Sequence, residues 1–380
     1  MASKTIANIE TVRAAVQVVN FRPGFRAASS VPTNADTIIL KQYHPDFLGV
    51  IGREPSFSLL LSSADSSKNP FFHHACAYLP QQDELYVTSN LLQSANSSKL
   101  PIILISKVSF RRGPNPTTAD DASPQPISAV EWMKLRPPAN MPMPAGAIAY
   151  QDGVLYCSQG ALVPESGGLC HMPLGKPPVP ILDTFFGTPF NSIHSVTQDR
   201  DGGLWFTDPC VGFELEFRPP PRLPNQVYRY HPRTGDLRAV ADEFGRPTGI
   251  ALSMDESTLY VTDTEAKRPD LTTDHQRAAT IYAFDVIQRF NSPCLVNRRL
   301  FAYAISGVPM VVACDFTGNV YAACADGIEV WNPAGVALGL IEVPGGCSSL
   351  CFGRQGELFV CAGQRLWRIQ LEHMRGDSSS

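Results

Sequence analysis

The chain has 380 residues, and 44% of them are hydrophobic, which is ample for a buried core and excludes global disorder. The formal net charge is −4, only 17% of the residues are charged, and lysines and arginines form no long runs, so nucleic acid and anionic membranes are poor partners. No stretch approaches the roughly 18 uninterrupted apolar residues of a membrane-spanning helix, so we expect no membrane span.

The cysteines and the first residues bear on the cellular compartment. The chain starts without the continuous apolar stretch of a secretory signal. Most of the ten cysteines lie in apolar, strand-like runs, such as those that end at Cys157, Cys314 and Cys361. This placement predicts buried free thiols rather than a disulfide framework. We therefore expect an intracellular, cytoplasmic protein.

The first part of the chain gives a mixed pattern. Residues 1–36 are predicted as an N-terminal extension, with a short helix around residues 9–19. Residues 37–40 and 57–62 are apolar and rich in strand-forming types, so we expect a strand at each.

From residue 75 onward, a two-strand unit recurs six times. Each unit has a small or polar residue, a strand, a turn, and then an aliphatic–aromatic pair that opens a second strand. The aromatic anchors of these pairs lie 38 to 70 residues apart and are Tyr86, Tyr156, Trp205, Tyr260, Tyr321 and Phe359. Trp205 and Tyr260 are expected to pack between neighbouring units rather than to contact substrate.

Six similar hairpins without an intervening helical pattern predict an all-β fold, a six-bladed β-propeller over residues 37–372, followed by a C-terminal tail over 373–380. A helical repeat is excluded because the periodicity is near two, and a β-sandwich would not predict six similar hairpins. The last strand, 365–369, has no unit after it. We expect the early strands between residues 37 and 62 to pair with it and close the ring.

Several segments resemble the gluconolactonase/SMP-30 family, and in particular its fungal lactonohydrolase branch. They are His73-His74-Ala75-Cys76, Phe190-Asn191-Ser192-Ile193-His194, Leu204-Trp205-Phe206-Thr207-Asp208-Pro209, Pro247-Thr248-Gly249-Ile250-Ala251 and Leu259-Tyr260-Val261-Thr262-Asp263-Thr264. The resemblance implies a six-bladed propeller with one divalent metal, usually calcium, at the top of the channel. It also implies that a Glu, two Asn and an Asp hold this metal.

All four ligand positions differ in this sequence, which has His74, His194, Thr248 and Met310 there. Each lies 11 or 12 residues before an aromatic anchor, so the four side chains should converge at one mouth of the channel. Calcium prefers six to eight oxygen ligands, which this set does not offer. We therefore expect neither metal nor cofactor. Zinc on the two histidines, with Cys76 or His73 nearby, is a weaker alternative because the other two positions are Thr and Met.

The candidate site residues follow from this alignment. The predicted catalytic residues are His74, His194 and Thr248. The predicted substrate-binding residues are Met310, His73, Asn90, Ser195, Asp208, Asp263 and Ser348. For the two aspartates, capping of backbone N–H groups is an equal alternative. Glu214 and Glu216 could reach over the mouth as an acid, although a solvated loop is the simpler reading. The sequence has no Gly-x-Ser-x-Gly motif and no phosphate-binding glycine loop.

A mouth lined by imidazole, hydroxyl and thioether suits a hydrophobic small-molecule substrate with a carbonyl to be polarised. In this respect the chain resembles the hetero-Diels–Alderases of fungal tropolone sesquiterpenoid pathways, which join a tropolone quinone methide to a humulene-type macrocycle. Such a reaction requires orientation and a hydrogen bond rather than a nucleophile. A lactone or ester hydrolase and a non-catalytic small-molecule-binding propeller remain as alternatives, and the sequence leaves the oligomeric state open.

Overall fold

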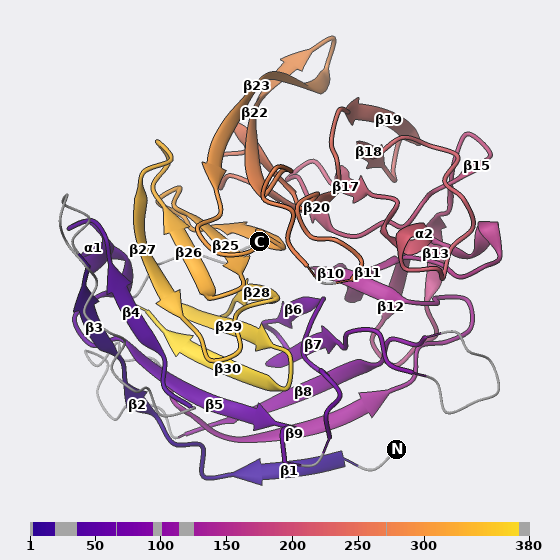
Figure 1. Cartoon of the computed structure of the whole chain (residues 1–380). Coiled ribbons are helices and arrows are strands. Elements are labelled where there is room, and N and C mark those ends of the chain that lie inside the picture. Colours follow the sequence, from indigo (N-terminus) through magenta and orange to yellow (C-terminus); the bar gives the residue numbers. More distant parts are fainter. Residues whose placement is uncertain are drawn as a thin grey trace.

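The computed structural model describes residues 3–19, 36–65, 67–93, 101–113, 125–270 and 272–371. Six sheets, which we call blades, surround a central channel (Figure 1). The predicted six-bladed β-propeller is confirmed. The predicted C-terminal tail, 373–380, lies outside the described residues.

Blades one to three contain strands β6 to β13 and β16 to β19, with β1 added to blade one. Blade one has β6 (Cys76–Leu79), β7 (Glu84–Thr88), β8 (Ile105–Arg112), β9 (Ile127–Leu135) and β1 (Ser3–Ala7). Blade two has β10 (Pro144–Tyr150), β11 (Gly153–Ser158), β12 (Gly168–Pro173) and β13 (Val179–Leu182). Blade three has β16 (Val196–Gln198), β17 (Leu204–Asp208), β18 (Gln226–His231) and β19 (Asp236–Ala241). A small hairpin, β14 (Thr184–Phe185) and β15 (Thr188–Pro189), precedes blade three.

Blades four to six complete the ring. Blade four has β20 (Pro247–Leu252), β21 (Thr258–Asp263), β22 (Thr280–Arg289) and β23 (Ser292–Tyr303). Blade five has β24 (Val311–Cys314), β25 (Val320–Cys324), β26 (Gly327–Trp331), β27 (Ala337–Glu342), β4 (Ile39–Gln42) and β3 (Ala15–Val18). Blade six has β28 (Ser349–Phe352), β29 (Glu357–Ala362), β30 (Arg365–Gln370), β5 (Ser56–Ser62) and β2 (Val12–Arg13). The helices described are short: α1 (Phe47–Ile51), α2 (Val211–Glu214) and a 3₁₀ turn, η1 (Pro164–Ser166).

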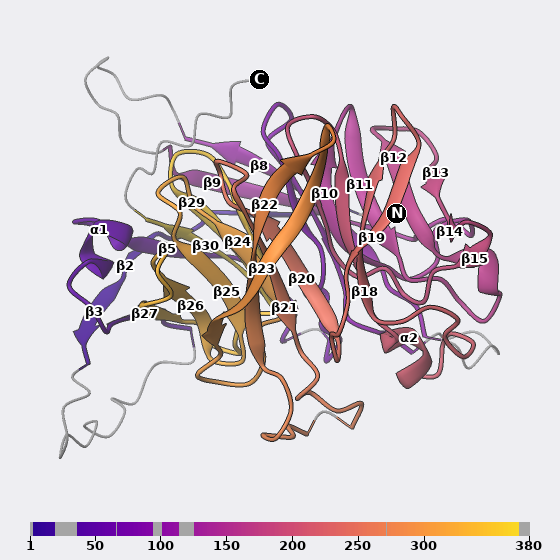
Figure 2. The ribbon, with the colours of Figure 1, turned by 90° about the horizontal axis from the view of Figure 1, so that it is seen from above.

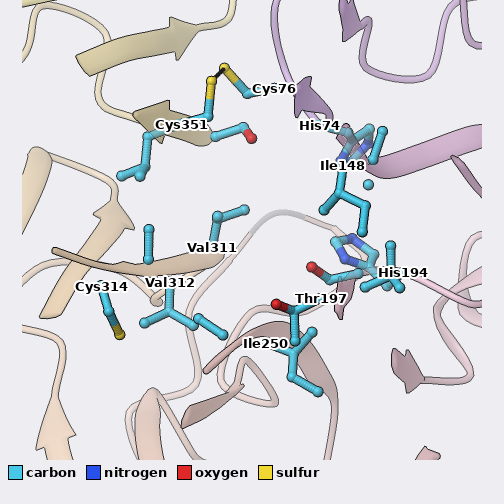
Figure 3. Close-up of a pocket in the computed structure, with 18 of the residues that line it drawn as sticks. His74, Cys76, Ile148, His194, Thr197, Ile250, Val311, Val312, Cys314 and Cys351 are labelled. Atoms are coloured by element: carbon cyan, nitrogen blue, oxygen red, sulfur yellow. Dashed lines mark hydrogen bonds between the residues drawn. The ribbon is translucent and has the colours of Figure 1, made fainter. Parts of the chain in front are cut away.

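The innermost strand of each blade, from β6 to β28, faces the channel, and neighbouring inner strands contact one another around the axis. These strands surround a cavity, shown in close-up in Figure 3. In the view at right angles, α2 and the loop that joins β21 to β22 lie toward the same face of the ring (Figure 2). That face carries the candidate site.

The aromatic anchors are buried in the blades, as the sequence predicted for Trp205 and Tyr260. Each is at most 4% exposed, and the set is Tyr86, Tyr156, Trp205, Tyr260, Tyr321 and Phe359. Trp205 packs with Ile250 and Val261 of blade four, so the anchor of one blade fills the space toward the next. Large aromatic side chains bury much apolar surface, which stabilises the contact between blades.

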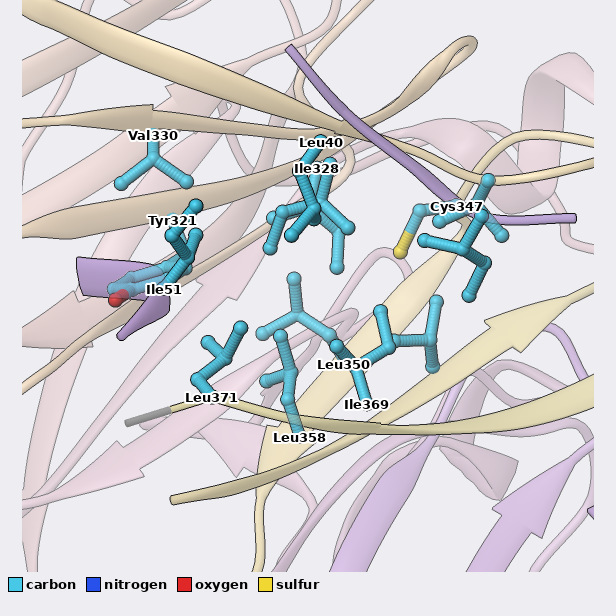
Figure 4. Close-up of a cluster of buried hydrophobic side chains, with 14 of the residues drawn as sticks. Leu40, Ile51, Tyr321, Ile328, Val330, Cys347, Leu350, Leu358, Ile369 and Leu371 are labelled. Atoms are coloured by element: carbon cyan, nitrogen blue, oxygen red, sulfur yellow. The ribbon is translucent and has the colours of Figure 1, made fainter. Parts of the chain in front are cut away.

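The ring closes by pairing of the N-terminal part with the C-terminal part. Strand β30 pairs antiparallel with β5, from Arg365 opposite Ser62 to Gln370 opposite Ser56, so the predicted closure is confirmed for this early strand but not for β4. Strand β4 joins blade five by pairing with β27. A hydrophobic cluster between blades five and six includes Leu40 and Ile51 from the early chain (Figure 4). The pairing with β5 covers the outer edge of β30.

The prediction of a short helix over residues 9–19 is wrong. This segment contains β2, which pairs with β5, and β3, which pairs in parallel with β4. Strand β1 pairs with β9. Val12, Val16 and Val18 are β-branched and favour extended backbone, and the edges of the blades provide the hydrogen-bonding partners. The N-terminal residues thus line the outer edges of blades one, six and five.

A buried ion cluster joins blade six to blade one. The carboxylate of Glu357, in β29, is 1% exposed and accepts from the guanidiniums of Arg112, in β8 (2.7 and 3.0 Å), and Arg368, in β30 (2.6 Å). Arg112 also pairs with Asp83 at 2.7 Å. Every charge in the cluster therefore has an opposite partner, which offsets the cost of removing it from water.

The remaining expectations concern cysteines and membranes. All ten cysteines are free, as predicted. Cys76 and Cys351 lie on the inner strands β6 and β28, with their sulfurs 3.3 Å apart. Within the described ranges, no helix is long and apolar enough to cross a bilayer.

Candidate functional site

A pocket of about 100 Å³ lies at one end of the channel, and we call it the mouth pocket. The structure brings together all four residues that the sequence aligned there: His74, His194, Thr248 and Met310. The pocket is also lined by His73, Asn90, Leu91, Gln159, Val211, Glu214, Leu215, Arg246, Thr264, Lys267, Arg268 and Pro269. The common distance of the four residues from their aromatic anchors therefore corresponds to a common position in space.

The repeated backbone geometry of the blades explains this convergence. The backbone N–H groups of His73, His194 and Met310 donate to carbonyls at the end of the second strand of the same blade, at 2.8, 3.0 and 2.9 Å. Thr248 is the second residue of β20 and is 1% exposed. Each side chain thus stands where the chain enters an inner strand.

Three buried threonines fix these turns, and the sequence reasoning missed them. The hydroxyl oxygens of Thr88, Thr207 and Thr262 accept from the backbone N–H groups of Ala75 (2.9 Å), Ser195 (3.2 Å) and Gly249 (2.7 Å), respectively. All three threonines are fully buried. Their signal in the sequence was a threonine two residues after the aromatic anchor in blades one, three and four.

Three histidines form a row at the base of the mouth pocket. The ring centroids of His73 and His74 lie 4.5 Å apart, and those of His74 and His194 lie 5.7 Å apart, with each pair edge to face. Burial lowers the pKa of His194 to about 4. Burial, followed by the charge of Lys267, lowers the pKa of His73 to about 3, and burial next to His73 places the pKa of His74 well below its usual value. All three rings are therefore neutral near pH 7.

The Nδ1 atom of His194 is buried and has no hydrogen-bond partner in the described part of the chain. The side chain is 5% exposed. A buried polar atom without a partner is costly, and a ligand or a water molecule can satisfy it. This atom is the first indication that the pocket is shaped for a bound molecule.

Three cations line the mouth pocket, Arg246, Lys267 and Arg268, and none of them was predicted from the sequence. Arg246 precedes β20, and its guanidinium donates to the carboxylate of Glu214 in α2 and to the backbone carbonyl of Lys267. Lys267 belongs to the loop between β21 and β22, which is polar, lacks periodicity and gave no local signal. Glu214 thus lines the pocket as the partner of Arg246, whereas Glu216 does not line it.

Asp208 and Asp263 lie behind the loops and do not line the mouth pocket. Asp208 accepts from the backbone N–H groups of Asn191 (2.9 Å) and Ser192 (2.7 Å), and burial raises its pKa to about 7. Asp263 accepts in the same way from Gly245 and Arg246, both at 2.8 Å. Both carboxyl groups therefore make the backbone-capping contacts that the sequence analysis weighed as an alternative to substrate binding.

The other predicted residues take different positions. Asn90 lines the mouth pocket, and its side-chain oxygen accepts from the backbone N–H of Leu91 at 2.8 Å. Ser195 lines the second cavity, described next. Ser348 precedes β28, donates to the carbonyl of Cys361 at 3.0 Å and does not line either cavity.

A second cavity of about 260 Å³ extends along the channel on the other side of the histidines, and we call it the channel chamber. His74 and His194 line both cavities and so separate them. Figure 3 shows Ile148 and His194 on one wall of the chamber and Val311 and Val312 on the other. The walls are largely aliphatic, so the chamber suits an apolar molecule.

The mouth pocket does not fit a calcium or zinc ion. Its aligned residues offer two imidazoles, a hydroxyl and a thioether, and calcium prefers six to eight oxygens. The positive charges of Arg246 and Lys267 line the same pocket and oppose a divalent cation. The sulfur of Cys76 contacts Cys351. Among the described residues, no three His, Cys, Asp or Glu side chains form a group that could hold a metal ion.

The chain is similar to proteins of known class. The profile of the SMP-30/Gluconolactonase/LRE-like region matches residues 128–364. A gluconolactonase of Zymomonas mobilis is 29% identical over 250 residues, and the match covers 60% of this chain and 66% of that protein. A lactonohydrolase of Aspergillus oryzae is 26% identical over 336 residues, with coverage of 82% and 69%. The solved structure of a gluconolactonase from Xanthomonas campestris shares the fold, with a TM-score of 0.66, 24% identity and coverage of 87% and 94%.

Proposed function

This chain belongs to the SMP-30/Gluconolactonase/LRE-like family, and we propose that it uses the propeller channel of that family for a metal-independent cycloaddition. The proposed reaction is an intermolecular hetero-Diels–Alder addition of a tropolone quinone methide to a humulene-type sesquiterpene. The supporting observation is the pair of cavities that meet at neutral histidines: a polar mouth pocket and an aliphatic channel chamber.

The chemistry of the pocket supports a reaction of this type. A concerted cycloaddition forms two new bonds at the same time, releases no group and exchanges no proton or electron with the protein. The protein holds the two reactants in one orientation, and this alone can lower the barrier by about 7–11 kcal/mol. The aliphatic walls of the channel chamber suit the macrocycle, and the mouth pocket suits the more polar partner.

The polar residues would polarise the heterodiene. His194 and Thr248 line the mouth pocket, and we propose that they donate or relay a hydrogen bond to the carbonyl oxygen, which would favour the polarised transition state. The hydroxyl of Thr248 already contacts the hydroxyl of Thr264 at 2.7 Å, which orients it. We propose His74, His194 and Thr248 as the catalytic residues, with Met310 as a wall that contacts the substrate.

Lactone hydrolysis is the second candidate, and the names of the relatives favour it. A gluconolactonase and a lactonohydrolase are among the similar proteins. Hydrolysis requires an activated water molecule, and a general base works best when its pKa is near the working pH. Burial lowers the pKa of His194 to about 4, which makes it a weak base at pH 7. For this reason we place the cycloaddition first. The ten free thiols suit a reducing compartment, and we propose a cytoplasmic location.

The proposed function is tested by mixing the purified protein with an enzymatically generated tropolone quinone methide and a humulene-type alcohol. We expect a stereochemically defined adduct by chiral chromatography and mass spectrometry, formed at the same rate after exhaustive dialysis against EDTA or EGTA. The racemic, protein-free reaction is the control. Absence of a defined adduct, together with lactone hydrolysis that a chelator abolishes and calcium restores, would establish the hydrolase instead.

The contribution of the pocket histidines to turnover is expected to change by less than about 3-fold between pH 6 and 8. His194, with a pKa of about 4, and His73, with a pKa of about 3, stay neutral throughout this range, whereas a histidine with the usual value near 6.5 would titrate within it. As the pH falls toward 4, His194 gains a proton and activity should decline. Asp208 titrates near pH 7, but its carboxyl group faces backbone N–H groups away from the pocket. A bell-shaped profile centred in this range would indicate acid–base catalysis.

A further inference from the structure

The charges around the mouth pocket are paired internally, with one exception. Four carboxylates in this region are already engaged: Glu214 with Arg246, Asp274 with Arg268, Glu265 with Arg277, and Asp263 with backbone N–H groups. Lys267 lines the same pocket, and none of the described residues pairs with its ammonium group. The pocket therefore retains one uncompensated positive charge.

The surroundings of Lys267 make an unpaired ammonium group unfavourable. Burial, followed by the neighbouring Arg246, lowers its pKa. A charge that is partly removed from water needs an opposite charge or hydrogen bonds, and neither is provided by the described part of the chain. A bound molecule that supplies the negative charge offsets the free-energy cost of burying the ammonium group.

Two other features of the pocket point to the kind of molecule. His194 lines the same pocket, and its buried Nδ1 has no hydrogen-bond partner among the described residues, so we take this atom as the contact for a second polar group of the ligand. Leu91, Val211, Leu215 and Met310 supply apolar walls. The pocket is thus suited to an organic anion with an apolar body rather than to an inorganic anion.

We propose that Lys267 is the positive charge of an anion-binding subsite, which holds an ionised oxygen of the substrate while His194 contacts a neighbouring polar group. Two kinds of ligand have the required chemistry. One is a compact ring that carries an enolate oxygen of the tropolone type, and the other is a compact apolar ring that carries a carboxylate group. This inference deepens the proposed function and rests on it for the assignment of the mouth pocket to the more polar reactant.

The test is equilibrium binding by isothermal titration calorimetry at pH 8 with three probes. Tropolone carries the ionisable hydroxyl next to a carbonyl, tropone is the matched ring without the hydroxyl, and cyclohexanecarboxylate carries a carboxylate. We expect the wild type to bind tropolone at least 10-fold more tightly than tropone. Lys267→Met should weaken tropolone binding by about 10- to 100-fold, the usual range for one hydrogen bond to a charged group, and leave tropone unaffected.

Two variants serve as controls. Lys267→Arg keeps the charge and should bind tropolone within a few-fold of the wild type, which shows that the positive charge is what the subsite requires, whereas unchanged tropone binding shows that Lys267→Met is folded. Arg277→Met removes a positive charge from the same loop outside the pocket, where Arg277 pairs with Glu265, and should bind as the wild type does.

The possible outcomes distinguish the anion-binding subsite from the proposed cycloaddition. Lys267-dependent binding of cyclohexanecarboxylate alone supports the anion subsite and assigns a carboxylate to it. Equal binding of tropolone and tropone without Lys267-dependent binding of cyclohexanecarboxylate, or binding of all three probes that Lys267→Met leaves unchanged, overturns the subsite. Because the measurement needs no turnover, Lys267-dependent binding of tropolone by a protein that forms no adduct would support the subsite and reject the cycloaddition.

Discussion

Replacing Met310 with tryptophan is expected to reduce turnover by about 100-fold or to change the ratio of stereoisomeric products, with little effect on the fold. Met310 lines a mouth pocket of about 100 Å³, so an indole ring would take up much of the available space. A reaction that depends on orientation is sensitive to displacements of about 1 Å, which can cost about 100-fold. Product ratios by chiral chromatography and thermal unfolding of the variant provide the two measurements.

Met310→Leu is the matched control because it keeps an apolar side chain of similar volume, and we expect turnover within a few-fold of the wild type. His194→Ala completes the comparison. In a cycloaddition it removes one hydrogen bond, which is worth about 1–3 kcal/mol, whereas loss of an essential base costs more. If His194→Ala abolishes turnover while Met310→Trp leaves the products unchanged, the cycloaddition is rejected in favour of an acid–base enzyme.

Glu357→Gln is expected to lower the free energy of unfolding by about 3–5 kcal/mol, the usual cost of removing one partner of a buried ion pair. Glu357 is 1% exposed and accepts from both Arg112 and Arg368, so the neutral side chain leaves Arg368 buried without its negative partner. Because Arg112 lies in blade one and Glu357 in blade six, the substitution weakens the contact that closes the ring. Urea unfolding at pH 7 measures the change.

Glu54→Gln is the control for this prediction. The side chains of Arg13 and Glu54 are 71% and 81% exposed, and their charged atoms lie 3.9 Å apart. Such surface pairs contribute about 0–1 kcal/mol, so this variant should unfold as the wild type does. A Glu357→Gln variant that is as stable as Glu54→Gln would show that the buried cluster does not stabilise the ring.

The site combines neutral histidines with one cation, Lys267, that no described residue pairs. The ligand positions that the family resemblance assigns to a divalent metal carry side chains that do not fit one. Nearby, the loop between β21 and β22 provides Lys267, whose ammonium group has no partner in the described part of the chain, beside Arg268, which pairs with Asp274. A charged ammonium group can bind and polarise an ionised oxygen, which is the role that we propose for Lys267.

Much of the fold was determined by the sequence alone, because its information is local. Each hairpin has strand-forming residues, a polar turn and an aromatic anchor, and four of the six turns contain glycine; these features act within about 15 residues. Regular recurrence then predicted the six blades, the closing pairing of β30 with β5, and the shared position of His74, His194, Thr248 and Met310. The helix expected at residues 9–19 failed because the partners of β2 and β3 lie on blade edges that are distant in sequence.

Only the tertiary structure decided the charges of the site and the contacts between blades. Lys267 enters the mouth pocket from a loop without periodicity, and its position depends on the packing of α2 and blade four. The contact of Cys76 with Cys351 spans 275 residues, and that of Arg112 with Glu357 spans 245. Such contacts arise when the ring closes, so their energies depend on side chains that no local pattern links.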